Sequence, residues 1–339
     1  MEKKRGIDIR QINTHDRYED VAQAFICRNG RAYQLDSKRT GFTMIDGQDS
    51  LRVGLYGRII GQSAYKARSG VEFTPAEIYF VEPLKESKRK GKYIFANSEF
   101  TNSVYKAEEN GGFEAETDFI FPVIKSPCIK EFGIDENNNY CIFPYKKGSV
   151  ECVAITELAG RAEYLTNYLI RNKELIEKQS KRSRDIARGK EFYALSKVGL
   201  YTYGEYAVTF RDNTRLVACV VTPVKTPWGK RVMPVCAKHS PYISMDKEGR
   251  FITEEEAYYL CGILNTGVVQ EYFRFSFSGR SYSIDFNIKM PLYDSQNEKH
   301  RKMAELSRKA HTVYTDASKV SAIKKEIEEL YLYVCDEEQ

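Results

Sequence analysis

The sequence predicts an α+β protein in which two β-rich parts are joined by a helical segment and followed by C-terminal helices. Three observations support this fold class. Short apolar runs bounded by Gly, Pro and Asn fill two separate stretches, a run with few turn formers lies between them, and two amphipathic runs end the chain. The predicted parts are 1–150 (β-rich), 151–190 (helical connector), 191–295 (β-rich) and 296–339 (helices).

The first β-rich part contains several predicted strands. Residues 21–60 are interpreted as short strands because Gly and Asn turn formers, glycines 54 and 57 among them, interrupt the apolar runs. Two hairpins follow, each made of two apolar runs on either side of a polar stretch. Their strands are 78–81 with 93–96, and 119–124 with 140–145.

The connector and the second β-rich part differ in their density of turn residues. Residues 156–188 contain few turn formers, which predicts a helix in two pieces that ends at Gly189. Residues 192–253 return to a strand pattern, which is clearest at 206–210 and 216–221.

Three helices are predicted after residue 253. The first, 254–264, has carboxylates in its first turn, where they complement the helix dipole, and Thr253 as its cap. The other two cover 298–314 and 318–334. In the last helix apolar residues recur every three or four positions and form a stripe along one face. This stripe either packs on its own domain or binds a partner helix. The stripe consists of Val320, Ile323, Ile327, Leu330 and Val334.

Composition excludes several classes of protein. No apolar run approaches the roughly 18 residues of a membrane span, and the N-terminus is polar, so we expect a cytoplasmic protein. The eight cysteines include no Cys-x-x-Cys pair, and Cys236 with His239 lacks a second ligand pair. Reduced thiols and no metal site are therefore predicted.

The net charge is +5, and the basic residues that give rise to it gather in two segments. Residues 171–190 hold eight basic and three acidic residues, which gives +5 in that segment alone, and a second cluster occupies 85–92. Such clusters attract a polyanion, although a solvated helix face and a solubilising loop give the same pattern.

Catalytic signatures are absent from the sequence. An adenine methyltransferase needs a Pro-Pro element that holds the adenine and a glycine-rich loop that binds S-adenosylmethionine. The sequence has no Pro-Pro pair and no Gly-x-Gly, so neither element is predicted in this chain. A rival interpretation is a Mg²⁺-dependent restriction endonuclease that uses Asp20 or Glu19 together with Asp36 and Lys38. A second acid-x-Lys triplet, Glu86 to Lys88, lies in the basic loop.

Several short blocks of the sequence are similar to blocks of a known family and occur in the same order. These blocks are 65–71, 121–125, 142–145, 164–169, 172–175, 259–266 and 288–292. Together with 297–307 they resemble the target-recognition region that follows the catalytic domain in TaqI-like N6-adenine DNA methyltransferases of restriction-modification systems. The similarity covers about residues 65–317, and the catalytic half of such enzymes has no counterpart here.

The resemblance implies a module for sequence-specific recognition of double-stranded DNA, without catalytic residues of its own. S-adenosylmethionine and the extruded adenine would belong to a methyltransferase domain or subunit that acts as its partner. The chain would then be a fragment of a longer enzyme, a separate specificity subunit or a degenerate relative. The DNA-contacting residues that we expect are Arg68, Lys125, Tyr145, Lys147, Arg182, Arg211, Lys225, Arg231, Arg274, Arg280 and Tyr282. Trp228, the sole tryptophan, either anchors its loop by packing or stacks against a base.

Overall fold

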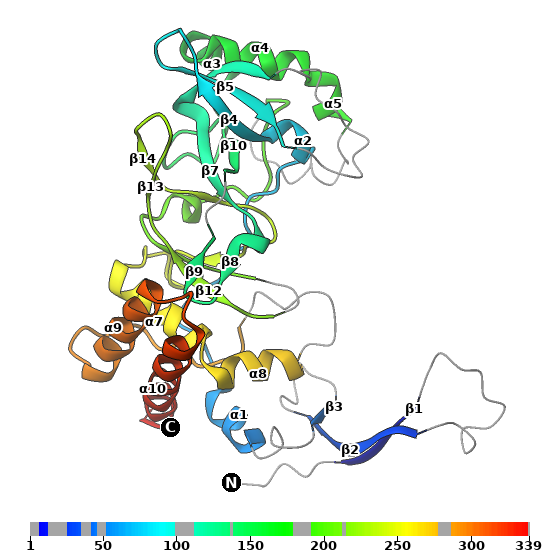
Figure 1. Ribbon diagram of the computed structural model, residues 1–339, viewed down its shortest axis with the longest axis vertical. Helices are drawn as coiled ribbons and strands as arrows, with labels where there is room; N and C mark the ends of the chain where they lie inside the picture. Colours follow the sequence, from blue (N-terminus) through cyan, green and yellow to red (C-terminus); the bar gives the residue numbers. More distant parts are fainter. Residues whose placement is uncertain are drawn as a thin grey trace, which may run out of the picture.

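The computed structural model describes residues 7–12, 26–34, 42–45, 52–98, 112–135, 138–178, 191–211, 215–276 and 286–337. Its fold is α+β with helices at the C-terminus, as the sequence predicts. Figure 1 shows two lobes stacked along the long axis, one built on a six-stranded sheet and one built mainly from helices. We call them the sheet lobe and the helical lobe.

The sheet lobe is organised by one mixed sheet with the strand order β15-β7-β10-β4-β5-β6. Its neighbouring strands are antiparallel except for β15, which runs parallel to β7. The two predicted strand pairs are confirmed as β4–β5 and β7–β10, although the first begins two residues late because α2 (Ala76–Tyr79) precedes it. Only the first pair is a hairpin, since two short strands at 129–134 lie between β7 and β10, and β10 ends at residue 142. The strands are β4 (Phe80–Glu86), β5 (Lys92–Asn97), β6 (Phe113–Glu116), β7 (Ile120–Ile124), β10 (Tyr140–Ile142) and β15 (Val235–Cys236).

Three short helices cover this sheet where one helix in two pieces was predicted. They are α3 (Ile155–Arg161), α4 (Glu163–Arg171) and α5 (Lys173–Glu177). The ring of Tyr168 on α4 stacks on Phe113 of β6 at 3.7 Å between centroids, and its hydroxyl accepts a hydrogen bond from Asn97 Nδ2 at 2.6 Å. The described part of this segment, up to residue 178, therefore packs on the sheet of the sheet lobe. Its predicted end at Gly189 lies outside the described residues.

The helical lobe contains five helices and a three-stranded sheet. The predicted helix at 254–264 is confirmed, and Thr253 caps it: its hydroxyl accepts from Glu256 N, while Glu256 Oε2 accepts from Thr253 N. The helices are α1 (Val53–Ile59), α7 (Glu254–Leu264), α8 (Gly267–Ser276), α9 (Glu298–Thr312) and α10 (Ala317–Glu337). The strands are β11 (Ala207–Phe210), β12 (Ala218–Val221) and β16 (Tyr242–Ile243).

Smaller strands complete the chain. An antiparallel N-terminal sheet contains β1 (Ile7–Ile12), β2 (Ile26–Gln34) and β3 (Phe42–Ile45). Two short hairpins contain β8 (Ile129–Lys130) with β9 (Gly133–Ile134), and β13 (Val224–Lys225) with β14 (Arg231–Val232).

The prediction of strands up to residue 60 is wrong for α1. Val53, Tyr56 and Ile59 recur every three residues and are buried on one face of this helix. Gly54 and Gly57, interpreted as turn formers, face open space on the other side. The three-residue repeat of buried side chains therefore determines the structure here, against the weak helix propensity of glycine.

The apolar stripe of the last helix packs on its own lobe. Val320, Ile323, Ile327 and Val334 are all buried, and Leu330 is partly buried. This outcome matches the first of the two alternatives, and it leaves the stripe covered by α7, α8 and α9.

Residues 65–71 carry the chain from the helical lobe to the sheet lobe. Main-chain hydrogen bonds tie this passage to a later segment: Arg68 and Tyr242 exchange both bonds, and Val71 N donates to Cys236 O at 2.8 Å. A Cβ atom on Gly70 would lie 2.1 Å from the carbonyl oxygen of Ala237. The two segments can lie this close because residue 70 has no side chain.

Candidate nucleic-acid interface

The hairpin of β13 and β14 runs along the left side of the sheet lobe in Figure 1. Lys225 and Arg231 are Cα partners in this two-stranded ribbon, so both side chains project from the same face. Both are exposed, and neither forms an ion pair with any residue that the structure describes. Two neighbouring cations without carboxylate partners suit a polyanionic ligand.

Trp228 holds the tip of this ribbon against the sheet. Its ring lies 5.6 Å from Tyr93, 5.9 Å from Phe95 and 5.2 Å from Tyr140, measured between centroids. Lys230, two residues later, forms an ion pair with Asp118. Of the two alternatives for the tryptophan, the packed anchor is the one observed, and the ribbon is fixed before any ligand arrives.

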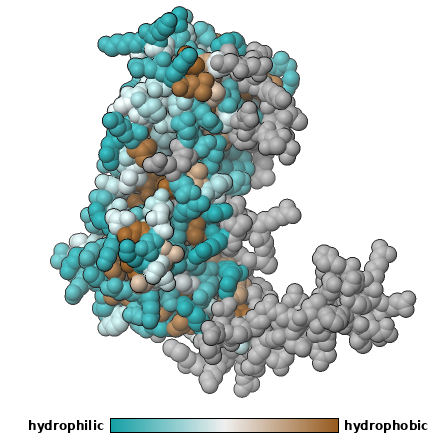
Figure 2. Space-filling model, viewed as in Figure 1, coloured by the Kyte–Doolittle hydropathy of each residue, from teal (hydrophilic) through white to brown (hydrophobic). Residues whose placement is uncertain are grey.

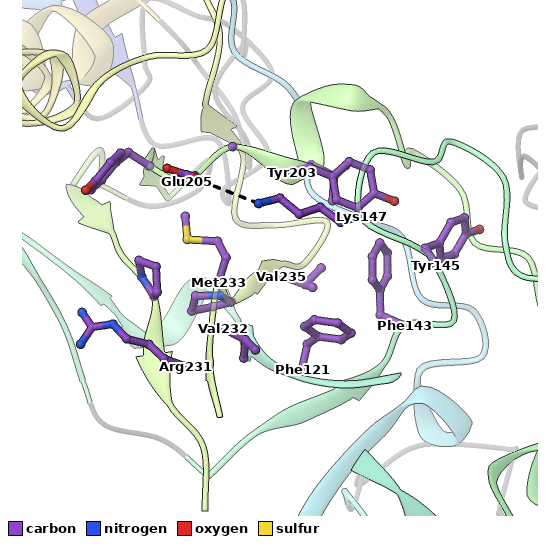
Figure 3. Close-up of a pocket in the computed structure, with 15 residues that line it drawn as sticks. Phe121, Phe143, Tyr145, Lys147, Tyr203, Glu205, Arg231, Val232, Met233 and Val235 are labelled. Atoms are coloured by element: carbon purple, nitrogen blue, oxygen red, sulfur yellow. Dashed lines mark ion pairs between the residues drawn. The ribbon is translucent and has the colours of Figure 1, made fainter. Parts of the chain in front are cut away.

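A cavity of about 350 Å³ opens beside the ribbon. Figure 3 shows how separate parts of the sequence form it: the strand with Phe121, the loop from Phe143 to Lys147, the run from Thr202 to Tyr206, Pro223, and the stretch from Arg231 to Val235. The ring of Phe121 meets that of Phe143 edge-on at 5.9 Å, and Phe143 stacks on Tyr145 at 4.7 Å. Five of the fifteen lining residues are aromatic, and Phe121, Phe143 and Tyr145 form one continuous part of the wall.

Charged side chains surround the mouth of the cavity. Lys147 Nζ lies 3.7 Å from Glu205 Oε1, and both side chains are 77% exposed (dashed line in Figure 3). Arg231 lies on the opposite rim. An ion pair as exposed as Lys147–Glu205 contributes about 0–1 kcal/mol to stability, so Lys147 can exchange Glu205 for another anion at little cost.

Tyr145 has a structural role in this site. It is buried, its hydroxyl donates to Leu195 O at 3.3 Å and accepts from Leu195 N at 2.7 Å, and burial raises the pKa of the phenol. The expected direct contact with a base is not available to a hydroxyl that is already paired twice. The ring supports Phe143 and so helps to form the cavity wall.

The basic loop at 85–92 lies next to the ribbon, because Trp228 packs on Tyr93 of β5. Within it Arg89 pairs with Glu114, and Lys92 with Glu116 at 3.7 Å. Lys85, Lys88 and Lys90 are exposed and form no ion pair with the described residues. Figure 2 shows a mainly hydrophilic surface on this side of the molecule, and the two basic hairpins are part of it.

Four other expected DNA contacts lie away from this group. Lys125 is half-buried, donates to Asn139 Oδ1 at 3.0 Å and lies over the ring of Phe80, and burial lowers its pKa. Arg68 lies over Tyr201 at 5.3 Å, between the lobes. Arg211 follows β11, and Arg274 lies over Phe275 at the end of α8. The structure thus brings Tyr145, Lys147, Lys225 and Arg231 together at the ribbon and the cavity. The residues Arg68, Lys125, Arg211 and Arg274 belong to neither.

Several expected residues lie outside the part of the chain that the structure describes. They are Arg182, Arg280 and Tyr282 among the DNA contacts, and Glu19, Asp20, Asp36 and Lys38 of the endonuclease interpretation. In the described ranges no group of three or more His, Cys, Asp or Glu residues could hold a metal ion.

The described cysteines are all free thiols. Burial raises the pKa of Cys236 to about 12, and it raises the pKa of Cys141 and Cys219 as well. Protonated, buried thiols are poor nucleophiles and poor metal ligands. Their chemistry therefore does not enter the site.

The cavity residues Phe121, Tyr203, Tyr206 and Met233 were not among the expected site residues. The only local signal was the aromatic run 201–206, and ordinary core strands also contain such runs.

Among the described residues no helix is long and apolar enough to cross a membrane. No family model matches the chain, and a comparison with curated proteins finds no match.

Proposed function

We propose that this chain recognises a sequence in double-stranded DNA, as the target-recognition module of an N6-adenine DNA methyltransferase or related restriction-modification system. The observation that carries the proposal is the pair of exposed cations Lys225 and Arg231, which form no ion pair within the described ranges, on an anchored two-stranded ribbon. The major groove of B-DNA accommodates a two-stranded ribbon, and Arg and Lys read guanine O6 and N7 there.

The blocks that carry the family resemblance supply core residues, which supports the same interpretation. Buried members include Tyr65, Ile142, Leu165, Tyr259 and Ile288, one from each of five blocks. These blocks form the scaffold, while the basic hairpins lie between them in sequence. A shared scaffold with variable loops is the arrangement expected of proteins that read different sequences.

The proposed partner is a methyltransferase domain or subunit that binds S-adenosylmethionine and carries out the chemistry. This chain would contribute the contacts that select the site, and it would act in the cytoplasm on intracellular DNA. Lys85, Lys88 and Lys90 would hold phosphates next to the ribbon, because flexible lysine side chains serve backbone contacts better than base readout.

Selection from a randomised duplex library tests the proposal. We expect an enriched sequence motif, and an affinity whose logarithm falls by about 0.9 per phosphate contact as the logarithm of the salt concentration rises. Arg231→Gln should relax one base position at a cost of about 1–3 kcal/mol. Lys225→Gln should reduce binding, either at one base position or by lowering the salt slope by about one contact.

The matched control is Lys325→Gln, which removes an exposed lysine on α10 in the helical lobe. It should leave both the selected motif and the salt slope unchanged. Absence of any enriched motif, or equal effects of Lys325→Gln and Arg231→Gln, would contradict the proposal.

A further inference from the structure

We infer that the cavity beside the ribbon holds one nucleotide that has left the base stack of the bound DNA. The inference rests on the proposed function and adds a site that adjoins the groove-reading ribbon and shares Arg231 with it. The expected ligand is a planar heterocycle attached to a phosphodiester backbone. The shape of the walls, the charge at the rim and the size of the space all lead to this ligand.

The walls offer aromatic faces and edges that are not fully used by the core. Phe143 is buried between Phe121 and Tyr145, whereas Phe121, Tyr203 and Tyr206 are only partly buried and face the cavity. Tyr203 is fixed by the hydrogen bond that its hydroxyl donates to Ser149 O. Rigid aromatic side chains are the surfaces on which proteins stack single bases, because every base has a π-face.

The rim supplies the complementary charge for a backbone. Lys147 and Arg231 lie on opposite sides of the mouth, and Lys225 is the cross-strand neighbour of Arg231. Figure 3 shows both rim cations outside the aromatic floor rather than within it. A base seated on the floor would therefore place its phosphates between them.

Size limits the occupant to a single residue of nucleic acid. A volume of about 350 Å³ lies at the small end of the roughly 300–1,000 Å³ typical of ligand pockets. Bases that enter protein pockets do so singly, after unstacking, and are held between aromatic or apolar side chains. The cavity opens beside the ribbon proposed to contact the duplex, so an extruded nucleotide has a short path into it.

A pair of short duplexes tests the inference. One is fully paired, and the other is identical except for a single unpaired thymine, which lowers the cost of extrusion. We expect wild-type protein to bind the second duplex more tightly, by between about fivefold and a hundredfold, which corresponds to one base stacked on an aromatic side chain. With 5-iodouracil as the unpaired base, photo-crosslinks should map to the peptides that contain Phe121 and Tyr203.

Two variants alter the cavity in opposite ways. Phe121→Ala removes a wall, and Val232→Trp fills the space from a partly buried position on β14. Each should abolish the preference for the unpaired thymine. Phe121→Ala, which lies on β7 and not on the ribbon, should leave affinity for the paired duplex unchanged. Leu292→Trp adds the same bulk at an exposed position in the helical lobe that does not line the cavity, and it should keep the preference.

The outcomes separate this inference from the proposed function. Equal affinity for the two duplexes, a preference that survives in a folded Val232→Trp protein, or crosslinks elsewhere would overturn the inference alone, and the cavity would then have another occupant. Failure to bind either duplex would overturn the proposed function together with it. Loss of the preference in both cavity variants, with paired-duplex binding intact in Phe121→Ala, supports both.

Discussion

The side-chain amide of Asn265 is hydrogen bonded to both main-chain groups of Ala218. Its Oδ1 accepts from Ala218 N at 2.9 Å, and its Nδ2 donates to Ala218 O at 2.8 Å. Asn265 is the C-cap of α7, and Ala218 begins β12, so one fully buried side chain fixes the helix to the sheet. The asparagine of the family-like block 259–266 thus has a structural role.

Substitution of Asn265 by Ala should lower the free energy of unfolding by about 2–4 kcal/mol. The Ala218 N–H would be buried without a partner, at about 1–3 kcal/mol, whereas the carbonyl would keep its bond from Phe132 N. Urea unfolding measures the change. Asn167→Ala, at an exposed position on α4, should change stability by less than about 0.5 kcal/mol, and a similar loss in both variants would argue against the bidentate bond.

Gly70→Ala should destabilise the protein by about 3 kcal/mol or more. The added Cβ would meet the main-chain oxygens of Cys236 and Ala237, which cannot rotate away as a flexible side chain can. Gly54→Ala on α1 is the matched control, because no atom lies within 4 Å of the added carbon. It should stabilise the helix by about 0.5–1 kcal/mol, and a thermal melt in which the two variants behave alike would refute the close approach.

Stability should depend on pH through His311. Its Nε2 accepts from Val220 N at 3.1 Å, and burial lowers the pKa of the ring to about 4 from its ordinary value of 6.5. As the pH falls from 6.5 to 4 the unfolded chain binds a proton that the folded protein does not bind. The free energy of unfolding should therefore fall by up to about 3 kcal/mol over that window, by 1.36 kcal/mol per unit of pKa difference.

The control for this prediction is a second histidine. His311→Gln should remove that part of the acid sensitivity between pH 6.5 and 4, whereas His239→Gln, at an exposed position, should retain it. Urea unfolding at several pH values provides the comparison. An unchanged slope in His311→Gln would show that the ring binds its proton equally in the folded and unfolded chain, which would contradict the prediction.

Removing the ribbon anchor should affect stability and DNA binding together. Trp228→Ala deletes the contacts with Tyr93, Phe95 and Tyr140, and we expect a loss of about 2–4 kcal/mol, since the ring is only partly buried. The freed ribbon would have to be ordered on binding, so the affinity for duplex DNA should fall as well. Because Trp228 is the only tryptophan, its emission in the wild-type protein should also change when DNA is added. Wild-type affinity in Trp228→Ala would show that the ribbon is not the contact.

Neutralising Glu205 should strengthen DNA binding without changing stability. Glu205→Gln releases Lys147 and removes a negative charge from the rim, and loss of so exposed a pair costs less than about 1 kcal/mol. We expect a few-fold gain in affinity that shrinks as salt screens the charges. Glu248→Gln, at an exposed position in the helical lobe, should leave the affinity unchanged, and an equal gain in both variants would indicate a general charge effect.

The sequence predicted the elements whose signals are local. The helix at 254–264 has its cap and first-turn carboxylates within four residues, and both predicted strand pairs have turn formers between their strands. The pairing of β15 with β7 could not be foreseen, because two residues after Pro234 pair with a strand more than a hundred positions earlier. The cavity was hidden for the same reason, since strands and loops that are distant in sequence form it only when the chain has folded.

The paired main chains of Arg68 and Tyr242 have a consequence for how the molecule could diversify. They close the base of a single long excursion, from residue 69 to residue 241, which contains the whole six-stranded sheet and both basic hairpins. Recombination at these two points would exchange that excursion as one cassette. The cassette would also carry β11 and β12, whose Val208, Phe210 and Val220 pack in the core of the helical lobe and would have to be kept. Asn265 contacts only main-chain atoms of Ala218, so that one contact would tolerate a change of sequence.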